Sequence, residues 1–251
     1  FNKSYFGLEK FLNILNEKTV LTESKKIICT SKETKDLMGL KYNDEIRNKI
    51  YVIPHCFDKK LYSNEKVQKS KESETKIKFR YIGKFYGKRF PKVLINALAK
   101  IEKENNEVFK KIAFEVFGSQ NFLVSAKIFF FRKYVKSYGP ISYSKSLQIM
   151  RESDYLLVID APFNKSVFFP SKLVDYMGSN NSVIGITPEG TAREVIKNMG
   201  GYTFSHNDPN VLANEILDLI NKNKKKELNQ DFINDFNSEL VSLKFQKVLE
   251  L

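Results

Sequence analysis

Between residues 77 and 204, short apolar segments alternate with amphipathic ones, and this alternation constrains the fold more than any other feature. The apolar segments predict strands at 77–82, 112–117, 134–138, 155–159, 182–186 and 202–204, and the segments between them predict helices. YLLVI, at 155–159, is apolar throughout, as expected of a strand covered on both faces. The pattern therefore predicts an α/β fold with a Rossmann-like parallel sheet and helices on both faces.

The segments on either side of this pattern are less regular. A helix is predicted over residues 1–19, followed by strands at 26–30 and 49–54 and, between them, a helix that Ser31 caps and Gly39 ends. Residues 63–76 contain one Val among polar and charged groups and predict a linker. Two further helices are predicted at 209–221 and 228–249.

The net charge of +13 indicates an anionic partner. Nucleic acid is the weakest candidate, because the sequence has no basic helix, zinc finger or aromatic-basic recognition motif. Cys29 and Cys56 have no metal-ligand spacing around them. We expect free thiols in a reducing compartment, and a disulfide between them is the alternative. No apolar run is long enough to span a membrane, and the N-terminus resembles neither a signal peptide nor a complete start, so we expect a fragment.

In a parallel sheet of this kind, ligands bind at the carboxyl ends of the strands. Gly83, Gly118, Gly139 and Asp160 fall at these ends in the predicted topology. The turn at 83–89 adds three cations, Lys84, Lys88 and Arg89, where a diphosphate would need neutralising. The alternative interpretation is a solvated basic turn.

A second candidate segment is FPSKLVDY, at 169–176. Its Pro-Ser pair predicts a helix start, and free N–H groups beside Lys172 would suit an anion. Asp175 follows Ser171 by one helical turn, so that its carboxylate could accept both hydroxyls of a ribose. A capped surface helix explains the same residues without a ligand.

Both segments resemble the C-terminal domain of retaining GT-B-fold glycosyltransferases of family 4, in its PSK-containing subgroup. YIGKFYGKRFPKVLINAL, at 81–98, is similar to the family's strand-Gly-Arg-x4-Lys-Gly-helix segment. Lys84 stands where the family has Arg, and Arg89 stands where it has Lys. YVIPHCFD, at 51–58, resembles a second motif, with Cys56 where Gly is usual, and PSKLVDY resembles a third, with Asp175 for Glu. The family's earlier acid is absent, because Val167 occupies its position.

The resemblance implies a role for each candidate residue. Lys84 and Arg89 would hold the donor diphosphate, supported by Ser171 and Lys172, and Asp175 would bind the ribose. The turn 139–141 would contact the base through its backbone. The residues that it implies for the donor site are Gly83, Gly118, Ser119, Gly139, Ile141, Ser171, Lys172 and Asp175. The expected catalytic residues are Lys84, Arg89 and Asp175. His55 could touch donor or acceptor, although a plain turn histidine is the favoured interpretation.

The implied activity is sugar transfer from a nucleotide diphosphate-sugar to a saccharide or lipid-linked acceptor, in bacterial surface polysaccharide synthesis, without cofactor or metal. Residues 1–62 would be a remnant of the acceptor domain, 63–240 the nucleotide-sugar-binding domain and 241–251 the end of a C-terminal helix. We then expect a cytoplasmic location and no activity from this chain alone. The alternatives are a non-catalytic nucleotide-binding module and a sugar-nucleotide epimerase.

KIFFFRKYVK, at 127–136, combines three Phe with four cations. The favoured interpretation is buried Phe with the cations on the rim. Contact with an anionic membrane at the inner face of the plasma membrane is the alternative.

Overall fold

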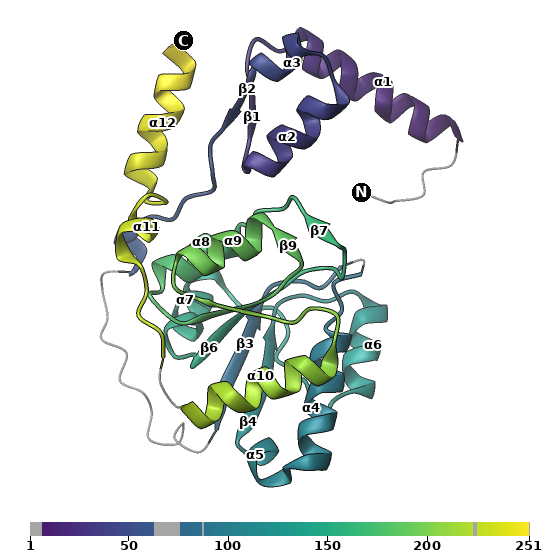
Figure 1. Ribbon diagram of the computed structural model, residues 1–251, viewed down its shortest axis with the longest axis vertical. Coiled ribbons are helices and arrows are strands. Elements are labelled where there is room, and N and C mark those ends of the chain that lie inside the picture. The colour runs from purple at the N-terminus through teal and green to yellow at the C-terminus, as the bar shows by residue number, and fades with distance from the viewer. Residues whose placement is uncertain (1–6, 63–75, 87, 223–224, 251) are drawn as a thin grey trace.

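The computed structural model describes residues 7–62, 76–86, 88–222 and 225–250, so most of the predicted linker at 63–76 lies outside the described residues. Its main feature is a six-stranded, wholly parallel sheet in the order β10-β8-β6-β3-β4-β5 (Figure 1). The strands are β3 (Ile77–Ile82), β4 (Ile112–Phe117), β5 (Lys136–Ser137), β6 (Tyr155–Ile159), β8 (Val183–Ile186) and β10 (Tyr202–Phe204). The predicted fold class is confirmed.

The strand order places the switch point of the sheet between β3 and β6. From β3 the chain moves outward through β4 to β5, and from β6 it moves outward in the other direction through β8 to β10. Gly83 follows β3 and Asp160 follows β6, so these two residues flank the crevice where the direction reverses.

Helices cover both faces of the sheet because its central strands are apolar on both sides. On β6, Leu157 and Ile159 join one core cluster, and Leu156 and Val158 join the other. The first cluster also contains residues of α4 (Lys92–Glu104) and α10 (Pro209–Lys222). The second contains residues of α7 (Tyr143–Arg151), α8 (Lys172–Gly178) and α9 (Thr191–Asn198).

A buried ion pair crosses the sheet between β3 and β4. Arg80 and Glu115 are register partners, and Arg80 Nε lies 2.8 Å from Glu115 Oε2. Arg80 also donates to the carbonyl of Ile149 in α7, and the Tyr138 hydroxyl donates to Glu115 at 2.8 Å. Since both charges have hydrogen-bond partners, the pair is tolerated in the core and fixes the chain just before Gly139.

The N-terminal part forms a small unit above the sheet domain (Figure 1). It contains α1 (Gly7–Glu23), α2 (Lys32–Lys41), α3 (Asp44–Asn48) and a parallel pair of strands, β1 (Ile27–Cys29) and β2 (Ile50–Val52). Ser31 caps α2 as predicted and accepts the Thr34 N–H at 3.1 Å. Gly39 does not end α2, which continues for two more residues.

The predicted last helix at 228–249 is wrong as one element. It is divided into α11 (Gln230–Asn234) and α12 (Ser238–Glu250), because the intervening backbone bonds to Phe57 instead. The Phe57 N–H donates to the Phe236 carbonyl at 3.0 Å, and the Ser238 N–H donates to the Phe57 carbonyl at 2.9 Å. Val241 and Val248 of α12 then pack against Ile53.

Three glycine turns meet at the carboxyl ends of β3, β4 and β5. The Gly83 N–H donates to the Phe117 carbonyl, and the Gly118 N–H donates to the Gly139 carbonyl, both at 2.7 Å. Gly118 has a φ of +137°, and a Cβ there would lie 2.6 Å from the Gly83 carbonyl oxygen. The Gln120 amide joins the first two turns, donating to Gly83 O and accepting from Phe85 N, each at 2.9 Å.

We predict that Gly118→Ala destabilises the protein far more than Gly139→Ala. Gly139 also has a positive φ, of +71°, but no atom lies within 4 Å of its added Cβ, so its cost is backbone strain of about 1–2 kcal/mol. Gly118→Ala adds an overlap with the Gly83 peptide, which should cost at least about 2 kcal/mol more. Denaturant unfolding of the two variants measures the difference, and equal losses would contradict the close approach of the turns.

Candidate functional site

Lys172, the first residue of α8, brings its ammonium directly onto the turn at Gly83. Its Nζ lies 3.5 Å from the centroid of the Tyr81 ring, and a Cβ on Gly83 would lie 2.8 Å from that nitrogen. Tyr176, one turn later, fixes α8 to the end of β3, because its hydroxyl oxygen accepts the Ile82 N–H at 3.1 Å. Two segments that the sequence singled out separately therefore converge.

The electrostatic surroundings of Lys172 disfavour its charge. Burial lowers the pKa of this lysine to about 7, and the positive charge of Arg89 adds to the effect, while Asp160 opposes it. No described carboxylate lies within ion-pair distance of the Lys172 ammonium. A group in this state gains its proton most readily when an anion arrives beside it.

Arg89 lies on the same side of the sheet but has an acidic partner. Its Nε donates to Asp160 Oδ1 at 2.9 Å. Its guanidinium carbon lies 4.5 Å from the centroid of the Tyr86 ring and 5.4 Å from that of Phe168. It also hydrogen-bonds the Tyr86 hydroxyl. A guanidinium has five N–H donors, so this arrangement orients Arg89 and leaves donors for a ligand.

Asp160 is the site residue whose role the sequence did not indicate. It is buried, and it accepts hydrogen bonds from the Ala161 N–H at 2.8 Å and from the Ser166 hydroxyl at 2.6 Å, besides that of Arg89. These bonds satisfy both oxygens, so Asp160 holds the loop after β6 and the guanidinium in one geometry. In the sequence, only its position at a strand end indicated Asp160, because its partner Arg89 lies 71 residues away.

Lys84 and Ser119 are exposed beside their glycines. No described carboxylate forms an ion pair with Lys84, so its ammonium remains available to a ligand. Lys88 is also exposed, with its Nζ 5.7 Å from the centroid of the Phe163 ring. These positions are consistent with the predicted roles of Lys84 and Ser119, which stay predictions.

Asp175 receives two phenolic hydrogen bonds on one oxygen. The hydroxyls of Tyr62 and Tyr143 both donate to Oδ1 at 2.9 Å. Burial and the Asp175 carboxylate raise the pKa of both tyrosines, which therefore stay protonated as donors. No described residue hydrogen-bonds Oδ2. Tyr143 follows Ile141 by two residues, so it connects Asp175 to the turn 139–141.

A cleft of about 590 Å³ adjoins this carboxylate. Ser171 and Asp175 line it from one side, and α12 and the segment around His55 line it from the other. The ring of His55 packs against Phe169, with centroids 5.7 Å apart, and burial lowers the pKa of this histidine, so it is mainly neutral at pH 7. His55 therefore lines the cleft, and its contact with donor or acceptor stays a prediction.

The N-terminal unit contacts the sheet domain at Val167, the position where the resembling family has its earlier acid. The Val167 carbonyl accepts hydrogen bonds from the hydroxyls of Ser31, at 2.7 Å, and Thr34, at 3.2 Å. Beside them, the Thr191 hydroxyl donates to the Glu33 carboxylate. The start of α2 thus brings a carboxylate to this loop from a different part of the sequence.

The described residues contain no group of three or more His, Cys, Asp or Glu that could hold a metal ion. Cys29 is buried and Cys56 exposed, and both are free thiols, as predicted. Within the described part of the chain, no helix is both long and apolar enough to cross a membrane.

Comparisons with known proteins agree with this architecture. No protein-family model matches the sequence. The uncharacterized glycosyltransferase MJ1178 of Methanocaldococcus jannaschii is 25% identical over 242 residues, which cover 93% of this chain and 61% of the relative. This chain therefore spans less than two thirds of that protein's length.

Solved structures share the fold over nearly the whole chain. Anabaena Alr3699/HepE in complex with UDP and glucose matches with a TM-score of 0.75 and 16% identity, over 99% of this chain and 69% of its own. The pneumococcal O-GlcNAc transferase GtfA in complex with UDP and GlcNAc matches with a TM-score of 0.65 and 16% identity, over 100% and 49%. The chain thus has the GT-B-like α/β fold of these glycosyltransferase structures.

We predict that the Lys172 side chain titrates near pH 7, because it is desolvated and lies beside Arg89. NMR of protein with ¹³C-labelled lysines should show one Cε resonance with a midpoint near 7, absent in Lys172→Arg. A spectrum in which no lysine resonance has a midpoint near pH 7 would contradict the arrangement.

Proposed function

We propose that this chain forms the donor site of a glycosyltransferase that uses a UDP-sugar. The observation that supports this most strongly is the contact of Lys172 with the Gly83 turn at the switch point of the sheet. The charge of Arg89 acts on Lys172, and Asp175 lies one helical turn beyond it. The arrangement provides cations for a diphosphate at one end and an acceptor for ribose hydroxyls at the other.

In this proposal the diphosphate lies over Gly83, where the absence of a side chain allows close approach. Lys172 and the unused N–H groups of Arg89 bind its oxygens, and Lys84 contributes from the exposed side. Asp160 acts as a positioning residue for Arg89. Charge-assisted contacts of this kind are stronger than neutral hydrogen bonds, and Arg suits the bidentate geometry of phosphate.

The ribose is assigned to Asp175. Oδ1 is already engaged by two tyrosines, whereas no described residue bonds Oδ2, so the 2′- and 3′-hydroxyls can donate there. Tyr143 then lies near the nucleoside, and the base falls beside Gly139 and Ile141. The cleft next to Ser171 and His55 is left for the transferred sugar or the acceptor.

The chemistry required of these residues is stabilisation of a leaving group. The bond between the anomeric carbon and the terminal phosphate oxygen breaks, its electron pair stays on UDP, and the acceptor oxygen bonds to the anomeric carbon while its proton passes to the departing phosphate. Lys172 and Arg89 stabilise the charge that develops on UDP. Retention of configuration follows the family 4 resemblance of PSKLVDY.

UDP is proposed as the nucleotide because HepE and GtfA were both solved with UDP. The family resemblance further supports a saccharide or lipid-linked acceptor, a role in surface polysaccharide synthesis and a cytoplasmic location for the protein. Val167 leaves the sugar without the family's earlier acid, and Glu33 is the nearby carboxylate that could replace it.

The function is tested by turnover. Full-length protein incubated with a UDP-sugar and acceptor extract should release UDP and give a product of retained anomeric configuration by NMR. A thermal-shift panel of UDP, GDP and ADP identifies the base, since the preferred ligand stabilises the fold most. Tight nucleotide binding without release of UDP from any sugar donor would instead favour the non-catalytic module.

We predict that Asp175→Asn weakens UDP binding but leaves 2′,3′-dideoxy-UDP unaffected. Loss of hydrogen bonds to a charged acceptor costs about 1.5–3 kcal/mol, so calorimetry should show a loss of roughly 10- to 100-fold for UDP. Wild-type protein should discriminate between the two ligands by a similar factor. Equal losses for both ligands would assign Asp175 a structural role.

A further inference from the structure

Helix α6 (Phe122–Phe130) turns an apolar face to the outside of the protein. Phe122, Leu123, Phe129 and Phe130 are 85%, 70%, 68% and 77% exposed. Leu123, Phe129 and Phe130 follow Phe122 by one, seven and eight residues, and this spacing places all four on one face of a helix. The opposite face packs inward through Ile128, which is buried.

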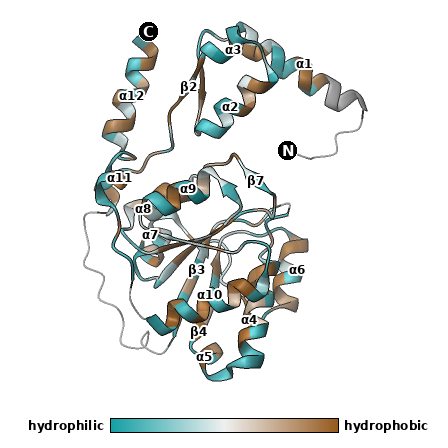
Figure 2. Cartoon of the chain, in the orientation of Figure 1, coloured by the Kyte–Doolittle hydropathy of each residue, from teal (hydrophilic) through white to brown (hydrophobic). Residues whose placement is uncertain are grey.

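The structure corrects the favoured interpretation of 127–136, in which all three phenylalanines were buried. Only Phe131 packs against the core. Phe129 and Phe130 point outward because successive residues of a helix face different directions, and Ile128 is the one that faces the core. Figure 2 shows the hydrophobic colouring of α6 at the edge of the sheet domain.

The segment that carries this face is rich in cations and contains no acid. Residues 116–151 contain no Asp or Glu and six Lys or Arg: Lys127, Arg132, Lys133, Lys136, Lys145 and Arg151. Lys133 is bound by Glu102 of α4 at 2.6 Å, so its charge is already paired. Lys127 and Arg132 form no ion pair with a described carboxylate, and the Arg132 guanidinium lies 4.7 Å from the centroid of the Phe129 ring.

We propose that α6 docks this chain on the surface of an anionic lipid bilayer. Phe122, Phe129 and Phe130 enter the boundary between headgroups and acyl chains, while Lys127 and Arg132 reach the lipid phosphates. Aromatic residues beside basic ones are the composition with which interfacial helices bind such surfaces. Each cation near an anionic leaflet adds to the attraction, and salt weakens it.

A bilayer fits this face better than a protein does. The four apolar side chains stand out from one helix, so a partner protein would have to supply the concave surface. A second copy of the chain would bring an equally basic segment against this one, which like-charge repulsion disfavours. An anionic bilayer offers phosphates for the cations of the helix and acyl chains for its apolar side chains.

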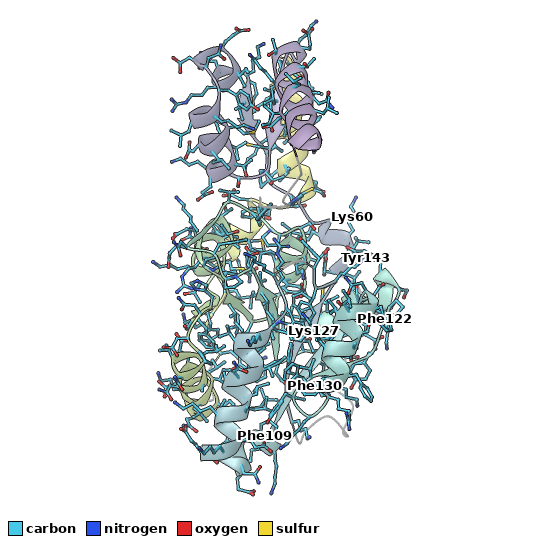
Figure 3. The ribbon with its side chains drawn as sticks, turned by 90° about the vertical axis from the view of Figure 1, so that its right-hand side faces the viewer. Lys60, Phe109, Phe122, Lys127, Phe130 and Tyr143 are labelled. Carbon is cyan, nitrogen blue, oxygen red and sulfur yellow. The ribbon has the colours of Figure 1, made fainter. Side chains whose placement is uncertain are left out.

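The position of α6 connects the face to the site described above. Asn121 caps α6, and the preceding residue, Gln120, holds the turns of Gly83 and Gly118. In Figure 3, Phe122 lies at the outer edge of the molecule. Docking would therefore hold the glycine turns of the donor site near the membrane, where a lipid-linked acceptor is found; this last point alone rests on the proposed function.

The test is co-sedimentation of the whole chain with vesicles of phosphatidylcholine, with and without phosphatidylglycerol. We expect binding to the anionic vesicles that decreases with added salt. Phe122→Ser/Phe130→Ser should weaken it by roughly tenfold or more, since two large apolar side chains no longer leave water. The matched control is Val20→Ser/Leu40→Ser, which changes residues that are 63% and 87% exposed on α1 and α2, and should bind as wild type does.

An unchanged melting temperature of the α6 variant would establish that its fold is intact, independently of the glycosyltransferase proposal. The inference is overturned if wild-type protein ignores anionic vesicles, or if both double variants lose binding equally. It is also overturned if sedimentation velocity shows a dimer that the α6 variant alone disrupts while vesicle binding persists.

Discussion

The contact between Lys172 and Gly83 joins the two halves of the sheet into one site. α8 follows β6, and Gly83 follows β3, so the contact spans the switch point. It depends on a glycine that admits the ammonium, on the Tyr81 ring beneath it and on Tyr176, whose hydroxyl holds α8 to β3. The burial that accompanies this contact lowers the pKa of the lysine to about 7. At neutral pH only part of the Lys172 population therefore carries a charge.

The fold could be predicted wherever the sequence pattern is local. β3, β4, β6 and β10 were predicted to the residue, because apolar segments bounded by glycine, acid or polar residues are unambiguous in a sheet covered on both faces. The helices α3 and α5 (Asn106–Lys110) were missed, since five residues do not establish a helical period. The break between α11 and α12 was missed because it depends on hydrogen bonds to Phe57, far away in sequence.

The sequence indicated candidate positions for the site but not the contacts between them. Strand ends and the PSK segment identified Gly83, Lys172 and Asp175, whose surroundings the structure now gives. The partners came from elsewhere: Asp160 orients Arg89, and Tyr62 and Tyr143 bond Asp175. No local pattern encodes these pairs, because each joins separate elements. The exposure of Phe129 and Phe130 likewise depends on which face of α6 meets the sheet domain, and composition alone does not determine that.

The most direct test of the Lys172 site is the proton balance of UDP binding at pH 8. A lysine with a pKa of about 7 is mostly neutral at that pH, whereas UDP is fully ionised. Calorimetry in buffers of different ionisation enthalpy should therefore show uptake of about 0.9 proton per UDP by wild-type protein and none by Lys172→Arg. Tight binding of UDP by the wild type without proton uptake would contradict the assignment of the diphosphate to Lys172.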